Sequence, residues 1–136
     1  MVRTIGAIIG TGLAMLLLDG AWLSLAAKRL YRPELENLLV DGFRLPPAAA
    51  FYALYVSGTV ILAVAPALTS ERWTIAIARG FVLGLVAYGT YDLTNQATLR
   101  HWSNLVTIID MGWGALLTGA SAGAGYFGAR AAVSMF

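Results

Sequence analysis

The chain contains four long runs of apolar residues, separated by short segments in which charged residues gather. The runs cover residues 4–27, 46–68, 74–99 and 104–128. Each is long enough to cross a bilayer as a helix, which takes about 20 residues. Buried helices of a soluble protein have the same periodicity, but the length of the runs and the charges on their flanks favour membrane spans. The pattern predicts an all-α, four-helix transmembrane bundle.

The connections between the runs predict how the helices are ordered. Residues 69–73 and 100–103 are so few that they allow only antiparallel hairpins. An up-down-up-down bundle follows, with both termini on one face of the membrane. The four spans use nearly the whole chain, so we expect residues 1–136 to form a single four-span domain.

The first connection, residues 28–45, is longer and has a pattern of its own. Leu35, Leu38 and Leu39 share one helical face, opposite Glu34 and Asp41. The same segment has Pro33, which suits a first helical position, and Gly42, which suits a helix end. We expect a short amphipathic helix at the membrane interface between spans one and two. An ordinary surface loop is the alternative.

Glycines recur at four-residue spacing within the apolar runs. The pairs are Gly6 and Gly10, Gly80 and Gly84, and Gly119 and Gly123. Such spacing lets helix backbones approach closely in lipid. We interpret these pairs as packing positions rather than as a binding site.

Composition agrees with a membrane protein. The 136 residues are 59% hydrophobic and 12% charged, whereas a soluble domain is about 25% charged. The net charge of +2 comes from basic residues scattered near helix ends, where topology requires them, so it does not indicate nucleic-acid binding. Cysteine is absent, which excludes disulfides and thiolate chemistry.

Three of the seven acidic residues fall inside predicted spans: Asp19, Asp92 and Asp110. A carboxylate at the centre of a spanning helix costs about 2.5–3.5 kcal/mol on insertion scales. Because the helices alternate in direction, all three lie toward the same face, at about 10 Å from their helix ends at 1.5 Å per residue. Intramembrane ionisable residues usually mark a functional site.

The neighbours of these aspartates are also polar. Tyr88, Asp92 and Asn95 share one helical face, and Asp19-x-x-Trp22 is repeated as Asp110-x-x-Trp113. We predict a ligand-binding set formed by Asp19, Tyr52, Tyr55, Tyr88, Asp92, Asn95, Thr107, Asp110 and Trp113. The alternative is a hydrogen-bonded core that fixes helix register, with Trp22 and Trp102 as interface anchors.

Several chemistries are disfavoured by the residues present. The only lysine, Lys28, and the only histidine, His101, lie outside the spans, which argues against a Schiff base and bis-histidine haem. The chain has no Glu-x-x-His pair for a di-iron site and no glycine-rich phosphate loop. No metal is assigned and the cofactor stays unknown. Carboxylates, an amide and hydroxyls suit a hard cation, a proton relay or a hydroxylated lipid head group.

The run from Ala87 to Leu99, AYGTYDLTNQATL, resembles a known bacterial family, the predicted membrane proteins of domain of unknown function 2177. Further similar signatures are Asp19-x-x-Trp22-Leu23, Phe51-Tyr52-x-Leu54-Tyr55-Val56 and Val106-Thr107-x-x-Asp110-Met111-x-Trp113-Gly114. The resemblance covers almost the whole chain. It implies a small four-helix protein of the bacterial inner membrane and supplies no activity.

The leading functional hypothesis is a polar intramembrane pocket that binds a small ligand, cation or proton, in transport or lipid-linked binding. No nucleophile–base pair is evident, which disfavours hydrolysis. The second hypothesis is a non-catalytic subunit or scaffold. A third is a membrane enzyme that uses paired carboxylates on a lipid. The expected partners are the bilayer and either further copies of the chain or another membrane protein.

Overall fold

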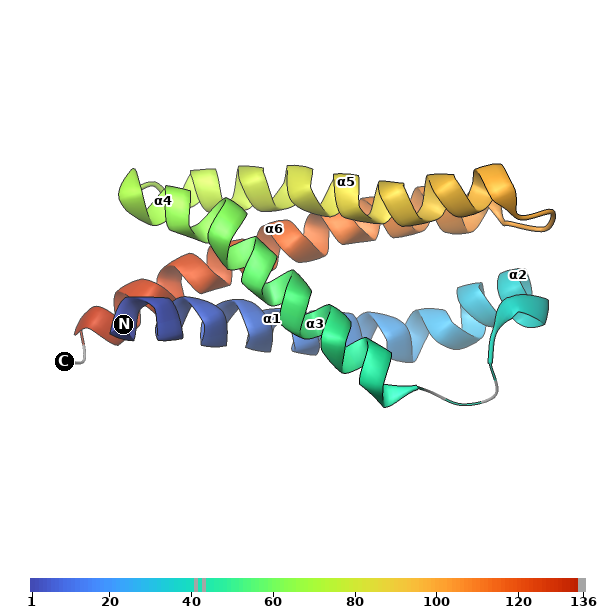
Figure 1. The fold of residues 1–136 in the computed structure, drawn as a ribbon, viewed down its shortest axis with the longest axis horizontal. Helices are drawn as coiled ribbons and strands as arrows, with labels where there is room; N and C mark the ends of the chain where they lie inside the picture. The colour runs from blue at the N-terminus through green and yellow to red at the C-terminus, as the bar shows by residue number, and fades with distance from the viewer. Residues whose placement is uncertain (41, 43, 135–136) are drawn as a thin grey trace.

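The computed structural model describes residues 1–40, 42 and 44–134, and within them every regular element is helical. Four helices are long and apolar enough to cross a membrane: Val2–Leu35, Leu45–Thr69, Trp73–Thr98 and Asn104–Ser134. The all-α fold with four membrane-capable helices is therefore confirmed. Figure 1 shows that each long helix runs back along the one before it, so that the two chain ends lie at the same end of the bundle.

The first long helix extends well beyond the predicted span of 4–27. It comprises α1 (Val2–Ala26), a π-helical turn (Ala27–Tyr31) and α2 (Arg32–Leu35), and a 3₁₀ turn (Glu36–Leu38) follows. The structure thus differs from the separate amphipathic helix predicted after Lys28, because Pro33 continues the first helix instead of starting a new one. Gly42, which has a φ of 92°, lies beyond the helical residues. Asp41, which the sequence predicts on the polar face of that helix, lies outside the described residues.

A π-helical turn also interrupts the second long helix, which comprises α3 (Leu45–Thr59), the π turn (Val60–Val64) and α4 (Ala65–Thr69). Each π turn ends two residues before a proline, Pro33 in one case and Pro66 in the other. A proline ring clashes with the carbonyl four residues earlier and cannot donate to it. The wider turn, closed by bonds from Arg32 to Ala27 and from Ala65 to Val60, lets each helix continue past its proline.

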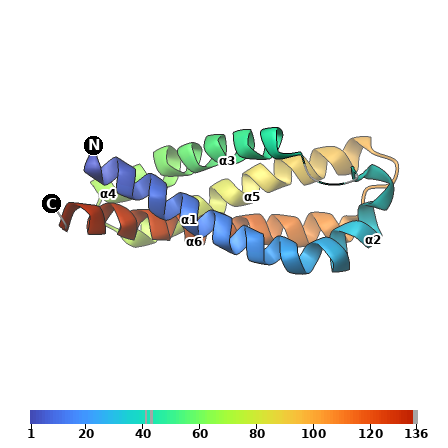
Figure 2. The ribbon, with the colours of Figure 1, turned by 90° about the horizontal axis from the view of Figure 1, so that it is seen from below.

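The last helix, α6 (Asn104–Ser134), is the centre of the bundle. Figure 2 shows α1 lying along α6, and α5 (Trp73–Thr98) packs on another side of it. A methyl group on Gly84 would lie 2.0 Å from the carbonyl oxygen of Gly114, and one on Gly6 would lie 2.5 Å from that of Gly128. These contacts confirm the packing interpretation of the glycine spacing, because no other residue allows such close backbones.

The side chains are arranged as lipid requires rather than as water requires. Leu17, Leu54 and Ile108 are more than 70% exposed on the outside, whereas Thr11 and Ser121 are completely buried inside. A surface of aliphatic side chains around a core of small and hydroxylated ones is stable in hydrocarbon and not in water.

Candidate functional site

Asp19 in α1 accepts hydrogen bonds from two other helices. The indole Nε1–H of Trp113 in α6 donates to its Oδ1 over 3.1 Å, and the hydroxyl of Tyr52 in α3 donates to its Oδ2. The side chain is only 8% exposed. Because a carboxylate is a pure acceptor, two donors aimed at its two oxygens match the ionised form. Both donors are neutral, so neither of them cancels the charge.

Asp110 in α6 has a comparable environment. The hydroxyl of Tyr31 donates to its Oδ1, and the indole of Trp22 in turn donates to that hydroxyl over 2.9 Å. The carboxyl group is also 8% exposed. Its Oδ2 has no hydrogen-bond partner among the described residues. Asp110 therefore keeps a free acceptor atom within a nearly buried position.

In each of the two Asp-x-x-Trp motifs, the tryptophan is hydrogen-bonded toward the aspartate of the other motif. Trp113 follows Asp110 in the chain but donates to Asp19, while Trp22 follows Asp19 but reaches Asp110 through Tyr31. The two indoles stack, with ring centres 4.6 Å apart and planes inclined by 12°. This stack joins α1 to α6, and each of its indoles is hydrogen-bonded toward one of the two carboxyl groups.

A cavity of about 690 Å³ opens beside this pair of carboxyl groups. Four residues of the first long helix line it at four-residue spacing: Asp19, Leu23, Ala27 and Tyr31. Tyr88 and Tyr91 of α5 and Val106, Asp110 and Trp113 of α6 line it from the other helices. Figure 1 shows why there is space, since α3 begins partway along the bundle and leaves the ends of α1, α5 and α6 uncovered by a fourth helix.

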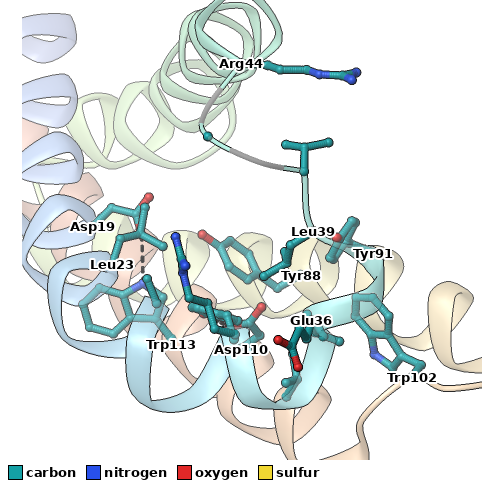
Figure 3. Close-up of a pocket in the computed structure, with 17 residues that line it drawn as sticks. Asp19, Leu23, Glu36, Leu39, Arg44, Tyr88, Tyr91, Trp102, Asp110 and Trp113 are labelled. Carbon is teal, nitrogen blue, oxygen red and sulfur yellow. Dashed lines mark hydrogen bonds between the residues drawn. The ribbon is translucent and has the colours of Figure 1, made fainter.

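The remaining described lining residues come from α2, at the end of the first long helix, and from the connections at that end of the bundle. They are Arg32, Leu35, Glu36, Leu39, Val40, Gly42, Arg44 and Trp102. Figure 3 shows Asp19 beside Trp113, Asp110 beside Tyr88, and Glu36, Leu39, Tyr91 and Trp102 farther along the cavity. The side chain of Arg44 extends away from Asp19 and Asp110 in the same view.

Asp92 is separate from the cavity. It is completely buried in α5, and neither of its carboxyl oxygens has a hydrogen-bond partner among the described residues. Asn95, one turn further, is half-buried and does not line the cavity. Within the described part of the chain, no three acidic or histidine side chains are grouped as a metal ion would require. The structure thus brings two of the three aspartates to one cavity and leaves the third outside it.

The other predicted residues have different roles. Tyr55 donates to the Oγ1 of Thr118 over 2.8 Å, since that hydroxyl itself donates to the Gly114 carbonyl. The ring of Tyr88 packs on Gly114, where a methyl group would lie 2.2 Å from its Cγ. Thr107 accepts a hydrogen bond from the indole of Trp102 over 3.0 Å. Tyr88 therefore belongs to the cavity wall, Thr107 supports Trp102 in that wall, and Tyr55 ties α3 to Thr118 of α6.

Sequence reasoning missed Tyr31 and gave Trp22 only an anchoring role. Tyr31 lies in the predicted connection of residues 28–45, beyond the span that ends before Lys28 and Arg29. The signal that could have found it is the spacing, since Asp19, Leu23, Ala27 and Tyr31 share one face if the helix continues past those two charges.

The comparisons with known proteins agree with this architecture. No curated protein and no solved structure matches the chain. The family described as predicted membrane protein (DUF2177) matches residues 4–127, which is nearly the whole chain. Four helices of spanning length, an apolar exterior and that match together place the chain in the DUF2177 family of predicted membrane proteins.

Proposed function

We propose that the protein binds a small molecule in the cavity beside Asp19 and Asp110, as the binding step of a membrane carrier or receptor. The observation that carries this proposal is a pair of nearly buried aspartates on one cavity, one of which has an acceptor atom without a hydrogen-bond partner among the described residues. Burying a carboxyl group in a membrane protein costs free energy, and an apolar side chain would pack there without that cost. The carboxyl pair therefore indicates a function other than packing.

The size and lining of the cavity support a molecule rather than a bare metal ion. Its volume of about 690 Å³ lies within the range of roughly 300–1,000 Å³ that small-molecule sites occupy. Most of its wall is aromatic or aliphatic, and a few polar groups are placed at defined positions, as in such sites. The described residues offer no group of three ligands that a metal ion would need.

Native mass spectrometry of the protein released from membranes tests the proposal. Ala27→Trp fills the cavity from its wall, whereas Ala21→Trp places the same side chain on the exposed surface of the same helix. We expect a bound small molecule on the wild type and on Ala21→Trp, and its loss from Ala27→Trp. Circular dichroism and size-exclusion chromatography check that both variants keep the fold.

Two results would contradict the proposal. Either the wild type carries no bound molecule when it is released in mild detergent, or the filled variant carries it as well as the control does. A stoichiometric protein partner on an otherwise empty chain would support the scaffold hypothesis instead.

A further inference from the structure

We infer that the group received between Asp19 and Asp110 is an organic ammonium ion. This inference rests on the proposed function, because it names the chemical class of the ligand that the cavity takes. It is carried by three features of the cavity: the uncompensated carboxyl pair, the aromatic walls and the placement of the basic residues.

The first feature is a pair of acidic groups that have no cationic hydrogen-bond donor among the described residues. Within the part of the chain that the structure describes, every hydrogen bond to the two carboxyl groups comes from a tyrosine or a tryptophan, and none comes from an arginine. Neutral donors orient the carboxyl groups but leave their charge to be balanced by something else. The free Oδ2 of Asp110, on a side chain that is 8% exposed, is the atom available to an incoming N–H or ammonium group.

The second feature is the aromatic wall. Among the described residues, five aromatic side chains line the cavity: Tyr31, Tyr88, Tyr91, Trp102 and Trp113. The faces of tyrosine and tryptophan rings attract cations, and aromatic enclosures are a common way to bind quaternary ammonium groups. A carboxyl pair inside an aromatic wall thus favours an organic ammonium group over a small inorganic cation.

The third feature is where the basic residues lie. The charged residues of the lining, within the described part of the chain, are the acids Asp19, Glu36 and Asp110 and the bases Arg32 and Arg44. Both arginines are exposed, and Arg44 extends away from the carboxyl pair in Figure 3. Among the described lining residues, three acids outnumber two arginines, which favours a cation at the buried carboxyl pair, and the arginines suit an anionic part of the same ligand.

Two sources supply this chemistry: the ethanolamine head group of a phospholipid, and a free amine dissolved in water. The chain has no cysteine, so a single introduced thiol reports on the cavity without background. Ala27→Cys places that thiol in the cavity wall, and Ser70→Cys places one in the exposed turn at the opposite end of the bundle.

The measurement is the rate at which methanethiosulfonates modify each thiol in purified full-length protein. The reagents carry a trimethylammonium group, a sulfonate group or no charge. We expect the cation-to-anion rate ratio for Ala27→Cys to exceed that for Ser70→Cys by on the order of tenfold, because focused fields raise encounter rates by at least that factor. Adding Asp110→Asn should reduce the excess, and adding Arg32→Gln should increase it.

The source is identified by protection of the Ala27→Cys thiol. Free ethanolamine or tetramethylammonium that slows modification indicates a soluble amine. Slowing only in nanodiscs that contain phosphatidylethanolamine, and not in discs of phosphatidylglycerol alone, indicates the lipid. Protection from either source supports the inference, and protection from neither overturns it.

The failure of this inference is distinguishable from the failure of the proposed function. If the uncharged reagent reaches the Ala27→Cys thiol but the charge ratio equals that of Ser70→Cys, the cavity is accessible and the ammonium inference is wrong. If no reagent reaches that thiol while Ser70→Cys reacts normally, the cavity is closed and the proposed function itself loses its support.

Discussion

At the scale of single residues, the three aspartates that look equivalent in the sequence have different environments. Asp19 accepts two hydrogen bonds and Asp110 accepts one, whereas Asp92 is completely buried with none from the described residues. A buried carboxyl group without a hydrogen-bond partner lowers the stability of the fold. Removing one that accepts hydrogen bonds also lowers stability, because its buried donors lose their acceptor. The same substitution should therefore have opposite effects at different aspartates.

We predict that Asp19→Ala lowers and Asp92→Ala maintains or raises the stability of the folded protein. Asp19→Ala leaves the indole of Trp113 and the hydroxyl of Tyr52 without their acceptor, at a cost of about 1–3 kcal/mol. Asp92→Ala removes two oxygens that have no described partner and adds a better helix former. Thermal unfolding in detergent, followed by circular dichroism, measures both effects. Equal losses of stability in the two variants would contradict the different environments of these side chains.

At the scale of helices, prolines and glycines decide how the elements continue and how they meet. Both π turns precede a proline and keep a helix continuous where a regular helix would break. The carbonyl of Leu62, four residues before Pro66, accepts a hydrogen bond from the guanidinium of Arg79 in α5 over 3.2 Å. Arg79 thus supplies the donor that the proline lacks, in addition to any part it has in topology.

We predict that Arg79→Ala lowers stability by about 1–3 kcal/mol, because an unpaired backbone carbonyl in a membrane protein is costly. The loss should be smaller in the Pro66→Ala background, where the backbone regains an N–H at that position. A double-mutant cycle of unfolding free energies measures this coupling. Arg72→Ala, at an exposed position just before α5, is the control and should change stability by less than about 0.5 kcal/mol. An additive cycle would show that Arg79 does not act on the carbonyl near Pro66.

A second prediction at this scale concerns the contact between α5 and α6. Gly84→Ala should destabilise the bundle by about 1–3 kcal/mol. The added methyl group would lie 2.0 Å from the backbone oxygen of Gly114, which cannot rotate away. Gly20→Ala in α1 meets nothing within 4 Å and should be neutral or stabilising. Thermal melting of the two variants in one detergent compares them. If the Gly84→Ala protein is as stable as the Gly20→Ala protein, Gly84 of α5 does not lie in close contact with Gly114 of α6.

At the scale of the whole molecule, the cavity results from an uneven bundle. The ends of α1, α5 and α6 extend past the beginning of α3, and the residues between α2 and α3 line the cavity that is left. Both chain ends lie at the opposite end of the bundle, where N and C are marked in Figure 1. The cavity therefore lies at the end of the bundle that bears the first and third connections.

We predict that the two termini lie on the same side of the membrane. Green fluorescent protein and alkaline phosphatase are fused in turn to each terminus. The first is fluorescent only on the cytoplasmic side of the membrane, and the second is active only on the other side. Both termini should therefore give the same pair of signals. A fusion at the turn that contains Ser70 should match the termini, and one at the turn that contains His101 should give the reverse. Opposite signals from the two termini would exclude the four-helix arrangement in the membrane.

The sequence by itself determined that the chain is a membrane protein of four helices and that glycines bring these helices together. Those properties follow from local patterns: the length of the apolar runs, the scarcity of charge and the four-residue spacing of small residues. The sequence also indicated Asp19 and Asp110, because a carboxyl group in an apolar run is conspicuous wherever the helix packs. It did not reveal that the first helix continues to Tyr31, since two basic residues usually mark a helix end at the membrane surface.

Only the tertiary structure decided which polar residues work together. Each tryptophan bonds toward the aspartate of the other motif, and Asp92 stays apart although it lies on a polar stretch of α5. Helical spacing specifies which side chains share a face, but the rotation and crossing of two packed helices determine which faces meet. That rotation depends on backbone contacts such as the one between Gly84 and Gly114, which are properties of the assembled bundle.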